Sequence, residues 1–327
     1  MYFPELVDQE DYERFCGRSL RLFLSVDIAN STALKQEFRE KDGSWLEIAR
    51  SFYTAFPTFL TSALDALSPV DPEAKPSLWK AIGDELVFVA EIGRMEDIPT
   101  LLRAHRAAVN QWNRQYEATQ VLVKAGAWLA GFPVMNSIIP GETPDRHDYI
   151  GSSIDTGFRL CRFASPRRFV VGVEVAYVVA HLNDPLAGEL HYDGRHEIRG
   201  VLKGMPYPII WVDCFADSKP PLLSAVAMAE DKITGRHAEG SNPKELESFL
   251  TAWIKSTSGE IQFPFPPRQE DSRFPLPSDY GDREQKKREE FERVYLQREG
   301  EGETDGNMAP STETESLIAK LKQSPAP

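Results

Sequence analysis

The chain lacks the features of a membrane, secreted or nucleic-acid-binding protein. It has only three cysteines, Cys16, Cys161 and Cys214, which form no pair motif and suit a reducing compartment. No apolar run approaches the ~18 residues that span a bilayer, and the first residues do not begin a signal peptide. With 37 Lys and Arg against 50 Asp and Glu, the net charge of -13 argues against DNA or RNA as a partner. We therefore expect a cytoplasmic protein with no nucleic-acid and no membrane partner.

Histidine is also scarce, and the six histidines show no spacing typical of metal ligands. The 41% hydrophobic content predicts one substantial core with appendages. Apolar periodicity indicates an α/β (α+β) chain, with helices over 44–67, 97–116 and 154–163, a hairpin over 78–89, and strands over 121–129 and 209–212. We expect His105 to be a residue at the edge of the core rather than a catalyst.

Two aspartates stand at the ends of apolar, strand-like runs. Asp27 follows the run from Leu22 to Val26, and Asp84 follows Gly83 at the centre of the hairpin. Two such strand ends side by side would form an oxygen-only pocket suited to Mg²⁺ or Mn²⁺. The alternative is that each aspartate caps a turn or a helix.

A third segment runs from Asp148 through Gly151 and Asp155 to Arg159. In this order and spacing, the three segments resemble the catalytic domain of class III nucleotide cyclases, over roughly residues 18–213. That family has a strand ending in Asp-Ile, a hairpin reading Lys/Glu-x-x-Gly-Asp, and a Gly-x-x-Val-Asn-x-Ala-x-Arg helix. The resemblance implies a ferredoxin-type sheet with helices on one face, and a homodimer with shared active sites.

The resemblance also implies a site for metal and phosphate. Asp27, Asp84 and the backbone carbonyl of Ile28 would hold two Mg²⁺ or Mn²⁺ ions. Such a pair of ions lowers the pKa of the ribose 3′-hydroxyl and bridges the attacking and leaving oxygens. Arg159 and Lys203 would meet the negative charge of the nucleoside triphosphate substrate.

By the same resemblance Lys80 and Asp148 would read the base, as a hydrogen-bond donor and an acceptor. Adenine, cytosine and uracil all satisfy that pair. Trp79 and Tyr149 stand beside them and would shrink the pocket to a single ring, unless strand alternation turns both toward the core. Asp155 stands where the family has asparagine. Unlike asparagine, an ionised aspartate cannot donate a hydrogen bond.

The layout, with the catalytic domain expected from residue 18, and the hairpin sequence Trp-Lys-Ala-Ile-Gly-Asp-Glu-Leu also resemble the bacterial pyrimidine cyclases of Pycsar antiphage defence. We therefore predict cyclisation of UTP to cyclic UMP, a signal read by a downstream cyclic-nucleotide-binding effector. An adenylate cyclase is the first alternative. A non-catalytic nucleotide-binding module and a scaffold that recruits partners through its tail are the others.

The expected organisation has four parts. An N-terminal segment over 1–17 precedes the catalytic domain over 18–213, and a helical extension over 214–260 contains a helix over 246–254. From 261 to 327 the chain is acidic and rich in proline, a composition that buries too little apolar surface to offset its ordering entropy. We expect a flexible tail there, with a solvated helix over 283–297 as the alternative.

Overall fold

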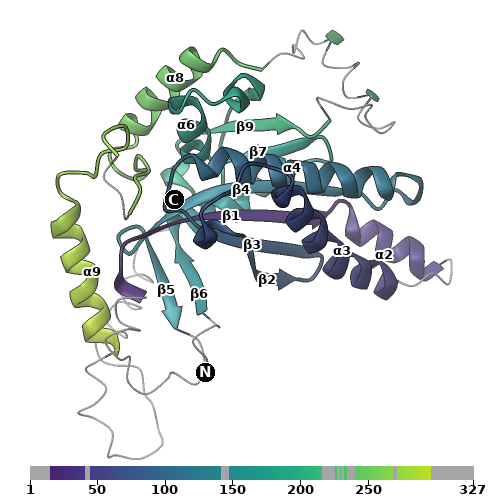
Figure 1. Ribbon diagram of the computed structural model, residues 1–327, viewed down its shortest axis with the longest axis horizontal. Coiled ribbons are helices and arrows are strands. Elements are labelled where there is room, and N and C mark those ends of the chain that lie inside the picture. Colours follow the sequence, from purple (N-terminus) through teal and green to yellow (C-terminus); the bar gives the residue numbers. More distant parts are fainter. Residues whose placement is uncertain are drawn as a thin grey trace, which may run out of the picture.

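The computed structural model describes residues 15–40, 45–140, 147–215, 240–267 and 271–295, with short pieces at 225–226, 229 and 232–233. Its centre is a seven-stranded sheet in the order β2-β3-β1-β4-β7-β9-β8, drawn in Figure 1. Only the β4–β7 pairing is parallel within this sheet. The strands are β1 (Ser19–Ile28), β2 (Ser77–Ile82), β3 (Glu85–Glu91), β4 (Val123–Phe132), β7 (Arg168–Val171), β8 (Leu190–His196) and β9 (Tyr207–Asp213).

Three helices, α3 (Trp45–Asp65), α4 (Asp97–Gln115) and α6 (Val173–His181), cover one face of this sheet. Figure 1 shows α3 and α4 lying across the strands. Alternate residues of β1, such as Leu22 and Leu24, enter the core on this side and belong to the same hydrophobic cluster as Phe56 of α3. The predicted α+β class is confirmed. His105, expected at the edge of the core, is instead fully buried on α4.

The opposite face carries a second, smaller core. Phe23 of β1 stacks on Trp128 of β4, with ring centroids 5.5 Å apart. This face is covered by the hairpin of β5 (Asn136–Pro140) and β6 (His147–Gly151), and by α5 (Ser152–Leu160). Helix α5 lies so close to the sheet that a Cβ atom on Gly157 would stand 2.1 Å from Trp128 Cδ2. The main helices therefore lie on one face, as predicted, and α5 adds a short helix on the other.

The C-terminal extension, which from here on means residues 240–267 and 271–295, is folded against the domain. Helix α8 (Pro243–Ser256) packs on α6, and α9 (Tyr280–Tyr295) runs beside the β5–β6 hairpin in Figure 1. Phe274 and Tyr280 are only 3% and 2% exposed, and the Tyr280 hydroxyl donates to the Phe132 carbonyl at 3.0 Å. Residues 261–267 and 271–280 do not fit the predicted flexible tail, because Phe265, Phe274 and Tyr280 bury apolar surface against the domain. Beyond them the structure has the largely exposed helix α9, which is the solvated helix that the sequence left as the alternative. The remaining tail, 296–327, lies outside the described residues.

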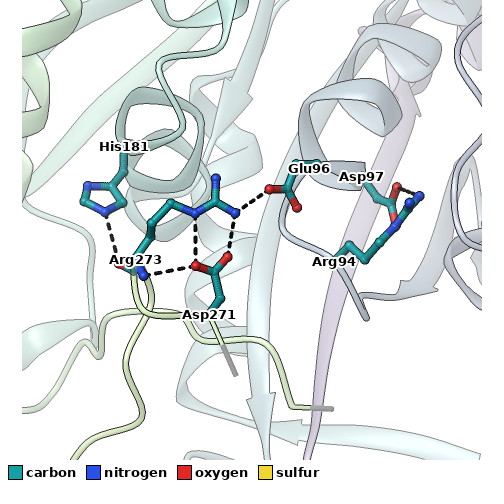
Figure 2. A network of polar contacts seen from close by, with 6 residues as sticks. All are labelled: Arg94, Glu96, Asp97, His181, Asp271 and Arg273. Carbon is teal, nitrogen blue, oxygen red and sulfur yellow. Dashed lines mark hydrogen bonds and ion pairs between the residues drawn. The ribbon is translucent and has the colours of Figure 1, made fainter. Parts of the chain in front are cut away.

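A polar network fastens this extension to the corner between α4 and α6 (Figure 2). The Arg273 guanidinium donates from Nε to Asp271 Oδ1 at 2.9 Å and also pairs with Glu96, just before α4. His181, the last residue of α6, places Nε2 3.0 Å from the Arg273 carbonyl. None of the described helices is both long and apolar enough to cross a membrane.

Glu174 lies in the seam beneath this extension and gives the fold a pH dependence. It lines a small pocket with Ile261 and Phe265, and burial raises the pKa of its carboxyl from 4.5 to about 7. Between pH 4.5 and about pH 7 the folded chain keeps a proton on Glu174 that the unfolded chain loses. The contribution of Glu174 to the free energy of unfolding is therefore largest below pH 4.5 and is lost as the pH rises to about 7.

We expect Glu174→Gln to raise the free energy of unfolding on the order of 2 kcal/mol at pH 8 and to have little effect at pH 4.5. Urea unfolding at both pH values measures this difference. The control is Glu117→Gln, at an exposed position. An equal effect of Glu174→Gln at both pH values would show that its carboxyl has an ordinary pKa.

Candidate active site

One half of the candidate site is built on a single row of the sheet. The register pairs Asp27 of β1 with Glu85 of β3 and with Lys124 of β4, so these three side chains share the face opposite α3 and α4. Asp84 lies in the tight turn between β2 and β3, and its carbonyl accepts a hydrogen bond from the Ile28 amide at 3.2 Å. This contact holds the hairpin turn against the end of β1 and brings the two aspartates together.

Each aspartate already has a lysine partner. Asp27 Oδ2 lies 3.2 Å from Lys124 Nζ, and Asp84 Oδ1 lies 3.0 Å from Lys35 Nζ. Burial raises the pKa of Asp27 although Lys124 opposes it, and the neighbouring Asp84 carboxylate adds to the rise. Burial also acts to raise the pKa of Asp84, but hydrogen bonds from Ser31 and Lys35 lower it overall. The two carboxylates thus stand close enough to interact, and both attract cations.

Three charged residues of this site, Lys35, Lys124 and Glu85, were not predicted from the sequence. Burial raises the pKa of the Glu85 carboxyl, which accepts a hydrogen bond from Ser25 Oγ at 2.6 Å. The available signal was Lys124, a single cation within the otherwise apolar strand predicted over 121–129. Lys35 had no comparable signal, because its pairing with Asp84 depends on where the hairpin folds.

The donor set fits a divalent ion that is bound together with its substrate. Within the described ranges, no group of three or more His, Cys, Asp or Glu side chains is placed to hold a metal. Asp27, Asp84 and the Ile28 carbonyl offer only hard oxygen donors, however, and Mg²⁺ commonly binds to one or two carboxylates while water and substrate phosphates complete its shell. These three residues would therefore hold the metal.

The structure brings the two predicted base-reading residues together. Lys80 Nζ lies 2.5 Å from Asp148 Oδ2, and the two side chains are 39% and 44% exposed. Lys80 pairs with Val87, one row along from the pairing of Asp27 with Glu85, so it projects from the same face of the sheet as Asp27. A base bound here would separate the two charges, accept a hydrogen bond from Lys80 and donate one to Asp148.

Trp79 lies on the same face as Lys80. A β-bulge between Leu78 and Lys80 shifts the register, so the simple alternation that would have turned Trp79 away does not hold. The indole packs against Phe23 with ring centroids 5.4 Å apart, and Lys80 Nζ lies 4.8 Å from the indole centroid. Half-buried, Trp79 stays available as a wall beside the Lys80–Asp148 pair.

Tyr149, in contrast, is a core residue. It pairs with the buried Ile138 across the β5–β6 hairpin and is only 3% exposed. Its hydroxyl contacts His147 Nε2 at 2.6 Å. The prediction that Tyr149 lines the base pocket is therefore wrong, because alternation along β6 turns it inward while Asp148 stays at the surface.

The three remaining predicted residues lie on α5 and on the turn before β9. Arg159 is exposed on α5 and donates to the backbone carbonyl of Arg199. Lys203 is 86% exposed and pairs with Glu260 of the extension at 2.6 Å. Asp155 is exposed in the first turn of α5, where the helix dipole favours a negative charge. No hydrogen bond or ion pair among the described residues joins any of these three to the two aspartates of the same chain.

Comparison with known proteins gives structural neighbours only. No protein-family model and no curated protein matches the chain. Among solved structures it is similar to the adenylyl cyclase CyaB from P. aeruginosa, with a TM-score of 0.46, 15% identity, and coverage of 63% of this chain and 97% of that one. It is also similar to the guanylyl cyclase Cya2, with a TM-score of 0.42, 14% identity and coverage of 63% and 95%. Adenylate cyclases from Trypanosoma brucei give a TM-score of 0.42, 13% identity and coverage of 59% and 89%. Likeness at this level establishes no activity, so the function has to be inferred from the residues themselves.

Proposed function

We propose that this chain is a metal-dependent nucleotide cyclase. It would convert a nucleoside triphosphate to a 3′,5′-cyclic mononucleotide and pyrophosphate. The observation that carries the proposal is that Asp27 and Asp84 lie close together beside the sheet face from which Lys80 projects, and that Lys80 in turn contacts Asp148. One pair suits a divalent ion with phosphate, and the other suits the edge of a base.

In this reaction the ribose 3′-oxygen bonds to the α-phosphorus, the bond from that phosphorus to the bridging oxygen breaks, and pyrophosphate leaves. The hydroxyl proton passes to solvent. Metal ions held by Asp27, Asp84 and the Ile28 carbonyl supply activation of the hydroxyl and neutralisation of phosphate charge when they are bound. Arg159 and Lys203 stabilise the charge that develops on the phosphoryl oxygens.

We further propose a head-to-tail homodimer with two shared active sites. Arg159 and Lys203 make no described contact with the aspartates of their own chain and are exposed. A second copy related by a twofold axis would supply them to the first, and the closed C₂ dimer is the commonest oligomer.

The finer proposal concerns the base. Trp79 beside the Lys80–Asp148 pair supports a pocket for one ring and hence UTP as the substrate and cyclic UMP as the product. Uracil would place O4 at Lys80 and N3–H at Asp148. A role of cyclic UMP as an antiphage signal acting on an effector rests on the sequence resemblance alone. Adenylate cyclase is the second candidate, since adenine satisfies the same two residues.

The test is incubation of the purified chain with each of the four ribonucleoside triphosphates and Mn²⁺, with products identified by mass. Cyclic UMP as the main product supports the full proposal. Faster turnover of ATP than of UTP would replace it with the adenylate cyclase. Binding of nucleotide without any cyclic product would favour the non-catalytic module.

Trp79→Ala should enlarge the base pocket. We expect the ratio of purine to UTP turnover, measured as kcat/KM, to rise about tenfold, since discrimination by an apolar wall is of that order. Leu78→Ala, at the exposed neighbouring position before the bulge, is the control and should leave the ratio unchanged. An unchanged ratio in Trp79→Ala would mean that other side chains set the size of the pocket.

A further inference from the structure

Lys35 forms a solvent-exposed ion pair with Asp84, one of the two candidate metal ligands. It lies on α2 (Ser31–Glu40), which begins just after β1, and its Nζ is 3.0 Å from Asp84 Oδ1. The ammonium also lies 5.0 Å from the ring centroid of Trp45. The Lys35 side chain is 40% exposed, so the ion pair is open to solvent and gains little stability from its geometry.

Lys124 provides the contrast. It pairs with Asp27 at a similar distance, 3.2 Å, but it belongs to β4 in the middle of the sheet and is 26% exposed. Its backbone is fixed directly opposite Asp27 by the strand register. Lys124 is therefore held beside its carboxylate by its own strand, whereas the more exposed Lys35 reaches Asp84 from a separate helix.

A divalent ion and an ammonium group compete for the same carboxylate oxygen. If a metal binds through Oδ1 of Asp84, Lys35 has to release that oxygen, and its charge is then next to the triphosphate that accompanies the metal. Lysine is a point-charge phosphate ligand on a flexible four-carbon stem, which suits such a transfer from one anion to another.

We propose that Lys35 is a further substrate-binding residue, which holds Asp84 in the metal-free chain and binds the triphosphate once metal occupies the aspartates. This inference rests on the proposed function. It adds a cation from the same chain that carries the aspartates, opposite Arg159 and Lys203, which would come from the partner. The triphosphate would then be held from both sides of the dimer interface.

The test measures binding rather than turnover, on the full chain, with two probes. The first probe is Mn²⁺ alone, followed by the electron paramagnetic resonance of the free ion. The second is inorganic tripolyphosphate at saturating Mn²⁺, followed by calorimetry, because it carries the phosphate chain without a base. The variants are Lys35→Gln, Lys35→Arg and Lys124→Gln, with Lys244→Gln at an exposed position on α8 as the control for net charge.

We expect Lys35→Gln to bind Mn²⁺ alone about threefold to tenfold more tightly, because a competing cation is gone, and to bind tripolyphosphate roughly tenfold more weakly. Lys124→Gln should also tighten Mn²⁺ binding but should not weaken tripolyphosphate binding. Lys35→Arg should retain tripolyphosphate affinity to within about threefold.

Two failures can be told apart. If the wild-type chain binds Mn²⁺ neither alone nor together with tripolyphosphate, the proposed metal-dependent function is wrong. If Mn²⁺ binds but tripolyphosphate affinity is unchanged or higher in Lys35→Gln, Lys35 is only a counter-ion of Asp84 and the further inference is overturned. Equal weakening by Lys244→Gln would also overturn it, since the effect would then be one of net charge.

Discussion

Asp27→Asn and Asp84→Asn are each expected to lower cyclic nucleotide formation by at least about a thousandfold, because each removes an anionic ligand from a metal site with few other donors. Both chains should stay folded. The carboxylates interact unfavourably and each faces a partly exposed lysine, so the free energy of unfolding without metal should change by less than ~1 kcal/mol. The measurements are product formation with Mn²⁺ and urea unfolding in a chelator.

The matched control is Glu91→Gln. Glu91 is at the far end of β3 and pairs with Arg21 at 3.2 Å, so this change removes an ion-paired carboxylate from the same strand but from outside the site. Turnover of this variant should remain within about twofold of wild type. Undiminished product formation by either aspartate variant would end the metal-site interpretation. A large loss of stability in either one would indicate a capping role instead.

Mixing two inactive variants should restore activity. In a mixed dimer of Asp84→Asn with Arg159→Ala, one site contains both lesions and the other contains only wild-type residues. Random exchange makes about half of the dimers mixed, and half of the sites in those dimers are intact. Roughly a quarter of wild-type turnover should therefore return if the sites are shared across a twofold axis.

The pairing of Asp84→Asn with Asp27→Asn is the negative control. Both of these residues belong to the same half-site, so every site in a mixed dimer carries a lesion and no activity should return. Subunit exchange has to be verified by co-purification of two tags. If exchange occurs and the Asp84→Asn with Arg159→Ala mixture stays inactive, each site is built from one chain and the shared-site proposal fails.

Site residues with a local sequence signature could be predicted, whereas those placed by distant contacts could not. Asp27 and Asp84 could be predicted because strand ends and tight turns have local signatures. An apolar run precedes Asp27, and Gly83, which has a φ of +65° in the turn, precedes Asp84. The pair of Lys80 and Asp148 was predicted by a family motif, and the structure brings the two within 2.5 Å.

Other features depended on contacts between distant segments. The inward place of Tyr149 was one of two readings that alternation allowed, and only the pairing of β5 with β6 decides it. The bulge at Trp79 breaks the period of two, and a bulge is set by how two strands pair rather than by the residues of one strand. The ion pair of Lys35 with Asp84 joins a helix to a hairpin 49 residues away and leaves no trace in local pattern.

Residues 261–295 show the same difference between what local sequence predicts and what distant contacts decide. Their sequence by itself determined that they are rich in proline, charge and isolated aromatics, a composition that cannot form a core alone. Only the tertiary structure decided that Phe274 and Tyr280 are buried, because the apolar surface that receives them belongs to the domain. Composition measures what a segment can bury within itself, whereas folding of this extension depends on the area that a distant part of the chain leaves uncovered.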